Sequence, residues 1–312
     1  MTQIKDINKF RMDFAKIFHS KVIPLLQNFD KERINTKRTA ITVSIIVYIL
    51  VFCIFRVVIQ TSDNFVNSIL FTLVIGLVPA FGVYTYFKKK YERGLKLAVM
   101  PFLMQAFGNF RWMPEFVIYD EEIKMSKLFT RFDRNKTDDN FIGSYKNVPI
   151  RISEVELTYT TRDSRGHRHR YTEFKGVLIS LEIPKKFTGH TIVRERDLIN
   201  FGPYQEVKLE DPEFSKNFYV SSTDQVEARY LLTTAFIQRY KNVQKAFGAN
   251  TISCSFLANK LLLAIPSYKD LFSLGDLNKP ASDTKQFTVF LNEMISIFEL
   301  IEELKVYQNI GL

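Results

Sequence analysis

The chain has 312 residues, and its 43 Lys and Arg outnumber its 33 Asp and Glu, which gives a net charge of +10. Its two cysteines, Cys53 and Cys254, exclude a disulfide framework and a cysteine-rich metal site, and they fit a reducing cytoplasm. The basic excess favours attraction to anionic lipid headgroups. Nucleic-acid binding is not expected, because no RNP-like aromatic motif or zinc-finger spacing is present.

Residues 1–38 are expected to form an amphipathic N-terminal helix. Apolar residues recur at steps of three and four from Ile4 to about Asn28, and lysines are interleaved with them. Such a helix can lie on a membrane surface, or it can dock its apolar face on the rest of the protein. The sequence leaves both alternatives open. Pro24 is expected to bend the helix near its end.

Residues 39–87 are expected to form a transmembrane hairpin. Two apolar stretches, 39–59 and 65–87, are separated by the polar run 60–64. Each is long enough to cross the hydrocarbon layer as a helix, which takes about 20 residues. The link between them is short, so the second helix must return directly.

Basic residues beside the hairpin indicate its orientation. They occur before the first span and after the second, whereas the link holds Asp63 and no Lys or Arg; they are Lys31, Arg33, Lys37, Arg38, Lys88, Lys89, Lys90, Arg93 and Lys96. Basic residues near span ends are retained on the cytoplasmic side. We therefore expect a protein integral to the bacterial inner (plasma) membrane, with two spans and both termini cytoplasmic.

Residues 88–114 are expected to form a connecting helix, and residues 115–280 a cytosolic α+β domain with a mostly antiparallel sheet packed by helices. Glu115–Tyr119 reads as a strand. Lys146-Asn147 marks a tight hairpin turn. Along the next strand the apolar residues change parity near Ser153-Glu154, which predicts a β-bulge there.

The C-terminal half of the chain has clearer helical patterns. Asp224–Phe247 has apolar residues at helical spacing, with a break expected at Thr233-Thr234 because either threonine can cap a second helix. Ala258-Asn259 is expected to be the turn of a hairpin. In the C-terminal segment 281–312, a wide apolar stripe predicts a long helix over Thr284–Val306.

Three stretches of the chain carry a resemblance to a known family. They are Lys88–Tyr91, the run Asp139–Ser153 leading to Phe174–Gly176, and, most specifically, Phe218–Leu232. From about residue 85 to 270 the chain resembles the bacterial membrane family called domain of unknown function 3137. The resemblance implies two spans followed by a cytosolic α+β domain, and it implies no activity.

The first candidate site is the hairpin tip within Thr161–Arg170, the densest basic cluster outside the membrane segment. Its candidate residues are Arg162, Arg165, His167, Arg168 and Arg170. Such a cluster can bind headgroup phosphate or an acidic partner. His167 and His169 could project to one side, but two histidines without a third ligand do not define a metal site. A solvated hairpin end is the alternative.

The second candidate site is Asp224, Glu227 and Arg229. Asp224 and Glu227 are three residues apart and can share a helix face, where a carboxylate pair could take a proton or a metal. The structural alternative is favoured, because a carboxylate in the first helical turn is stabilised by free backbone amides and the helix dipole. Arg229 would then pair with an internal acid.

The sequence favours a noncatalytic, membrane-anchored module that binds a protein or anionic lipid at the inner membrane surface. No phosphate-binding loop, dinucleotide fingerprint, metalloprotease helix or nucleophile elbow occurs. Neither a cofactor nor a metal is expected. The alternatives are a membrane-tethered enzyme that uses Asp224 and Glu227, and a hairpin that forms a homo-oligomeric conduit. Arg56 is the one acidic or basic residue within the two spans, which argues against transport.

Overall fold

The structure is a computed structural model, and it describes residues 3–58, 65–113, 115–183, 186–195, 204–268, 272 and 274–306. Side chains are described within 8–57 and 72–302 of these ranges. The chain divides into two compact units. Unit 1 comprises Met1–Met12, Met104–Phe272 and Phe287–Leu312, and unit 2 comprises Asp13–Leu103 and Ser273–Gln286.

Unit 1 is built on a nine-stranded sheet in which neighbouring strands run antiparallel, in the order β1-β2-β3-β4-β9-β8-β5-β7-β6. The strands are β1 (Arg111–Met113), β2 (Arg134–Tyr145), β3 (Val148–Arg162), β4 (Arg168–Glu182), β5 (Thr191–Glu195), β6 (Gln205–Glu206), β7 (Phe218–Ser222), β8 (Ser253–Leu257) and β9 (Lys260–Pro266). The helices of this unit confirm the predicted α+β class. They are α4 (Asp120–Met125), α5 (Pro212–Asn217), α6 (Gln225–Leu231), α7 (Thr234–Ala246) and α8 (Lys285–Val306).

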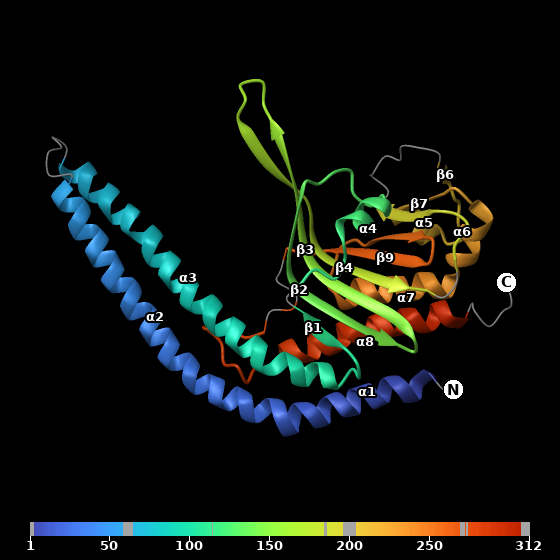
Figure 1. The fold of residues 1–312 in the computed structure, drawn as a ribbon, viewed down its shortest axis with the longest axis horizontal. Coiled ribbons are helices and arrows are strands. Elements are labelled where there is room, and N and C mark those ends of the chain that lie inside the picture. Colours follow the sequence, from blue (N-terminus) through green and yellow to red (C-terminus); the bar gives the residue numbers. More distant parts are fainter. Residues whose placement is uncertain are drawn as a thin grey trace. The chain divides into compact units, whose positions relative to one another are not determined.

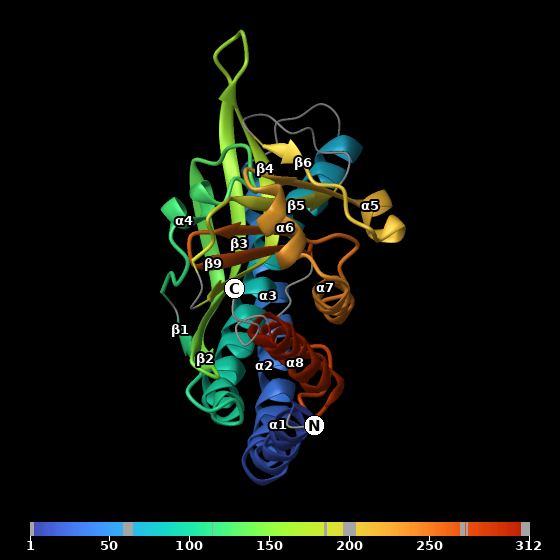
Figure 2. The same cartoon turned by 90° about the vertical axis from the view of Figure 1, so that its right-hand side faces the viewer.

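Both faces of the sheet are covered, with α4 on one side and α7 and α8 on the other (Figure 2). On the α8 face, Phe141 of β2 packs its ring 4.8 Å from Phe272 and 6.0 Å from Phe290 of α8. At the end of β2, the ring of Tyr145 stacks 4.6 Å from that of Phe298. These aromatic contacts hold the predicted C-terminal helix against the sheet.

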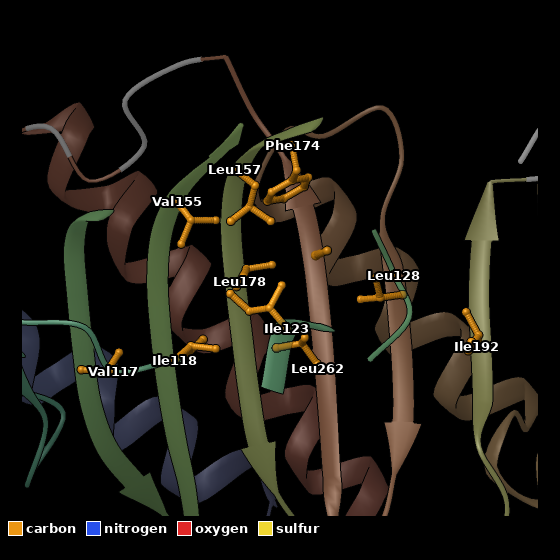
Figure 3. Close-up of a cluster of buried hydrophobic side chains, with 11 residues drawn as sticks. Val117, Ile118, Ile123, Leu128, Val155, Leu157, Phe174, Leu178, Ile192 and Leu262 are labelled. Atoms are coloured by element: carbon orange, nitrogen blue, oxygen red, sulfur yellow. The ribbon is translucent and has the colours of Figure 1, made fainter. Parts of the chain in front are cut away.

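The α4 face has its own core, shown in Figure 3. The segment before and through α4 places Val117, Ile118 and Ile123 over Val155 and Leu157 of β3, and all five are buried. Strands β4 and β9 complete this core with Phe174, Leu178, Leu262 and Ala264. Burial on both faces removes the alternation of buried and exposed residues that a one-sided sheet produces.

This two-sided burial overturns one sequence-based expectation and revises another. Residues 115–119 contain no strand, because the segment crosses the sheet face and buries the adjacent residues Val117 and Ile118 together. The parity change in β3 needs no bulge in that strand: Ile150 and Ile152 face one core, and Val155 and Leu157 face the other. The β2–β3 ladder is irregular at the predicted place, because Thr137 pairs with Val155 and Asn140 with Ser153, but the extra residue lies in β2.

The predicted turns and breaks are confirmed where local chemistry determines them. Lys146 and Asn147 join β2 to β3 with φ of 47° and 65°, the left-handed values of a tight hairpin. Ala258 joins β8 to β9 with φ of 55°. Thr233 separates α6 from α7 and accepts a hydrogen bond from the amide of Phe236. The final helix begins one residue later than expected.

The N-terminal helix is divided into α1 (Gln3–Ile17), a π-helical turn η1 (Phe18–Val22) and α2 (Ile23–Val58). The irregular turn lies just before Pro24, which falls in the first turn of α2. In unit 1, the ring of Phe10 lies 5.1 Å from Phe298 and 5.8 Å from Tyr145. At this residue the apolar face of α1 therefore docks on the domain.

In unit 2, helix α2 packs antiparallel to α3 (Phe65–Gln105). Phe29 lies beside Tyr91, whereas Tyr48, further along α2, lies beside Gly76, which comes earlier in α3. A Cβ at Gly76 would lie 2.9 Å from the Tyr48 ring, so this crossing needs glycine. Residues 274–286 pack on the same helices, where the Asp30 carboxylate accepts a hydrogen bond from the Ala281 amide at 2.7 Å.

Within the described residues, one helix, Asn8–Val57, is long and apolar enough to cross a membrane. This finding supports membrane anchoring. The second predicted span, 65–87, belongs to α3, and the side chains of its residues 65–71 lie outside the described part. Two spans and their orientation therefore remain predictions.

The α8 face contains a buried acidic side chain that makes stability depend on pH. Glu293 of α8 is 1% exposed, and burial, with a smaller effect of Glu154, raises its pKa to about 8. The carboxyl group is therefore protonated in the folded chain at pH 7. In the unfolded chain this carboxyl group has its ordinary pKa of 4.5, so the folded state loses stability as pH rises from about 4.5 to about 8.

We expect Glu293→Gln, which mimics the protonated carboxyl, to remove this loss. Thermal unfolding of the full-length chain between pH 5 and about 9 should show a midpoint that falls less in the variant than in the parent. Glu299→Gln, on the same helix, is the matched control and should retain the parent profile. Equal slopes for the parent and Glu293→Gln would contradict the assignment.

Candidate functional site

The predicted basic tip lies at the end of a two-stranded arm formed by β3 and β4, which extends beyond the rest of the sheet (Figure 1). The last pairs of the arm run from Tyr159 opposite Tyr171 to Arg162 opposite Arg168. The rings of the two tyrosines stack at 5.5 Å, and the guanidinium of Arg131 lies 4.0 Å above Tyr159. The base of the arm is thus braced by packed side chains.

Asp163 organises the turn at the tip. Its carboxylate accepts hydrogen bonds from the amides of Arg165 and His167, both at 2.9 Å. It also lies 3.1 Å from Nδ1 of His167 and 3.3 Å from Nε2 of His169. The hydrogen bond from the His167 amide, followed by those from the two imidazoles, lowers the pKa of Asp163.

The predicted tip residues are therefore all exposed at the end of the arm. Arg162, Arg165, Arg168 and Arg170 are exposed, as are His167 and His169. Asp163 holds both imidazoles on one side of the turn, while the arginines keep their charge in solvent. Such a surface can bind an anion. Among the described residues, no group of three or more His, Cys, Asp or Glu side chains could hold a metal ion.

The structure places Asp224 and Glu227 at the start of α6, where both carboxylates bind backbone groups. Asp224 caps the helix by accepting from the amides of Val226 and Glu227 at 3.0 and 2.9 Å. Glu227 accepts from the amides of Thr188 and Gly189 at 3.0 and 2.8 Å. The hydrogen bond from the Glu227 amide is the main cause of the lowered pKa of Asp224.

This arrangement ties the loop before β5 to α6. A Cβ at Gly189 would lie 2.7 Å from Cβ of Asp224, so the close approach needs glycine. Arg229 points elsewhere: its guanidinium donates to Gln225 at 3.3 Å, and it lines a cavity of about 440 Å³ with Asp211. Neither Asp224 nor Glu227 lines that cavity.

A half-buried ionic network on the α4 face was not predicted from the sequence. Arg151 of β3 donates to Glu122 of α4 at 3.0 Å and to Glu182 of β4 at 3.1 Å. Lys260 of β9 donates to Glu122 at 2.7 Å, and Ser180 also donates to this carboxylate. Burial opposes ionisation of Glu122, but the hydrogen bonds from Lys260 and Ser180 and the Arg151 charge outweigh it, so its pKa is lowered.

A second buried polar cluster surrounds His190. Its Nε2 lies 2.8 Å from Oγ of Ser255 and 3.2 Å from the Ser126 carbonyl oxygen. The Tyr204 hydroxyl lies 2.8 Å from Nδ1. Because a carbonyl oxygen only accepts, Nε2 carries the proton, and Nδ1 accepts from Tyr204. Burial lowers the pKa of His190, so the neutral ring donates towards Ser255 and does not act as its base.

Only weak signals in the sequence pointed to these clusters. Arg151 is a charge inside an apolar strand, which indicates a specific partner, because a buried charge must be paired. Its partner Glu122 is one of three acidic residues in the first turn of α4, and nothing in the local sequence distinguishes it from the other two. The ion pair forms because α4 covers the sheet, and that tertiary contact has no local signature.

We expect Arg151→Met to destabilise unit 1 by about 2 kcal/mol, because it removes charge-assisted hydrogen bonds to the half-buried carboxylates of Glu122 and Glu182. Adding Glu122→Gln should recover part of this loss, since one half-buried charge is then removed. Denaturant unfolding of the full-length chain measures both effects. The exposed Arg134→Met is the control and should change stability by at most about 0.5 kcal/mol. A similarly small loss for Arg151→Met would refute a structural role for the network.

Comparisons with known proteins give one family and one distant structure. Residues 172–306 match the family described as "Protein of unknown function (DUF3137)". No curated protein matches the chain in sequence. The crystal structure of the mycobacterial trehalose monomycolate transport factor A, TtfA, is similar over 63% of this chain and 89% of its own, with 13% identity and a TM-score of 0.35. That similarity is too low to support an argument about function. The family match confirms the resemblance found in the sequence over residues 172–306, which are similar to the DUF3137 family.

Proposed function

We propose that this protein is a noncatalytic module, anchored in the bacterial inner membrane, that binds anionic lipid headgroups through the basic tip of its β3–β4 arm. The observation that carries the proposal is the exposure of four arginines at the end of a projecting ribbon. Basic side chains at a membrane surface each gain about 1 kcal/mol from anionic lipid. An acidic protein surface is the alternative partner, with the same electrostatic requirement.

Exposed apolar side chains on α2 and α3 support anchoring by two spans. Ile49 and Ile54 of α2 are 52% and 59% exposed, and Val78 and Phe81 of α3 are 72% and 73% exposed. A water-soluble helical pair would bury such side chains, whereas lipid accommodates them. The basic residues beside both predicted spans favour cytoplasmic termini.

Binding is favoured over catalysis because the candidate acids are already occupied. Asp224 and Glu227 accept backbone hydrogen bonds at the start of α6, which leaves them little capacity to activate a substrate. A homo-oligomeric conduit remains the weaker alternative, since Arg56 is the one charged residue within the predicted spans.

The proposed topology predicts that reporters fused before residue 1 and after residue 312 are both active in the cytoplasm. A reporter inserted in the 60–64 link should be active on the opposite side. Paired cytoplasmic and periplasmic reporters at the three positions measure this directly. Periplasmic activity at either terminus would contradict the proposed orientation.

The tip predicts salt-sensitive binding to acidic vesicles. We expect the full-length chain in phosphatidylcholine nanodiscs to bind vesicles that contain phosphatidylglycerol, and Arg165→Ala/Arg168→Ala to weaken binding about 30-fold. The loss follows from removing two charges at about 1 kcal/mol each. Added salt should weaken parent binding, because it screens exposed charges.

Lys216→Ala/Lys245→Ala is the matched control, because it removes two exposed charges elsewhere on unit 1. It should leave vesicle binding close to the parent value. If the tip variant and this control bind equally well, headgroup recognition by the tip is refuted.

A further inference from the structure

A cavity of about 340 Å³ lies between α4 and the β8–β9 hairpin. Leu262 lies at its inner wall and is 2% exposed, and Leu257 is half-buried. Tyr119 and Met125, on the α4 side, are 62% and 59% exposed. The volume falls at the lower end of the range of small-molecule sites, roughly 300–1,000 Å³.

The polar groups around this cavity are already paired with one another. Glu122 is bound by Arg151, Lys260 and Ser180. Ser255 bonds to His190, and the Ser126 hydroxyl donates to the Ile123 carbonyl at 2.6 Å. A sugar or nucleotide would lose its hydrogen bonds to water here and find few replacements. The cavity therefore selects an apolar ligand.

The charges near the cavity also disfavour a phosphate or other compact anion. Lys260 and Arg151 are balanced by Glu122 and Glu182 within the same network. Glu121 adds a negative charge to the lining. A compact anion would gain little attraction, because each nearby cation already has a carboxylate partner.

We infer that this cavity binds a single acyl chain, with its apolar end against Leu262 and its polar end near Asn259 in solvent. This goes beyond headgroup recognition by the tip and uses different residues. Acyl chains are the apolar molecules most available to a membrane-anchored protein, so this choice rests on the proposed anchoring. Burial of each methylene group contributes to binding, and no charged partner is required.

Photolabelling of the full-length chain in phosphatidylcholine vesicles tests the inference. The probe is dodecanoic acid with a diazirine near the end of its chain. We expect labelled peptides to contain Met125 or residues 257–262, with labelling reduced by excess unlabelled dodecanoic acid. Labelling confined to α2 and α3 would overturn the inference, because it would report the surrounding bilayer alone.

Two variants fill the cavity from opposite walls. Leu257→Trp acts from β8, and Met125→Trp acts from the exposed end of α4, so a folding defect in one does not remove the test. Each should reduce labelling about tenfold, since losing the burial of two methylene groups already has that effect on affinity. Val226→Trp, at an exposed position on α6, should leave labelling unchanged. Unchanged labelling in both cavity variants would refute the site.

A second probe distinguishes the source of the chain. It is phosphatidylcholine with a diazirine in one acyl chain, incorporated into the same vesicles. Cavity labelling by this lipid would assign the ligand to the bilayer, and labelling by the dodecanoic acid probe alone would assign it to free fatty acid. Absence of cavity labelling with both probes would overturn the inference. None of these results depends on Arg165 or Arg168, so headgroup recognition stands or falls separately.

Discussion

The organising constraint in unit 1 is that both faces of its central strands must be covered. β3 buries Ile150 and Ile152 on one face and Val155 and Leu157 on the other. One layer comes from α8, and the opposite layer comes from the segment through α4 (Figure 2). Covering the α4 face encloses polar backbone and charged side chains, which must then be paired. The network around Arg151 and the cluster around His190 follow from that requirement.

The sequence predicts features that depend on neighbouring residues. Lys146-Asn147 and Ala258-Asn259 mark turns because each pair contains Asn, a common turn residue, and Thr233 marks a helix start because its hydroxyl binds a free amide. The same reasoning anticipated that free backbone amides at the helix start stabilise the Asp224 carboxylate, although it placed this residue in the first turn and not at the cap. It failed at residues 115–119, because the burial of Val117 and Ile118 depends on a sheet formed by distant segments.

The candidate sites also differ in whether they depend on neighbouring residues or on segments that are distant in sequence. The basic tip is readable because its charges are contiguous in sequence and its hairpin is local. The cavity beside α4 cannot be predicted from the sequence, because its lining joins residues 119–126 to residues 255–262 across the sheet. Glu122 and Lys260 are separated by most of the domain in sequence, so their ion pair could be found only once the strand order was known.

The arm has a consequence for how this fold can change. In the described strands, the residue pairs from Tyr159–Tyr171 to Arg162–Arg168 bond within the ribbon, while the core strands pair below them. Each added pair would lengthen the ribbon by about 3.3 Å without disturbing either hydrophobic layer. Insertions and deletions of matched residues are therefore tolerable there. A longer or shorter arm would change how far the basic tip lies from the sheet, while the hydrophobic core of unit 1 stays the same.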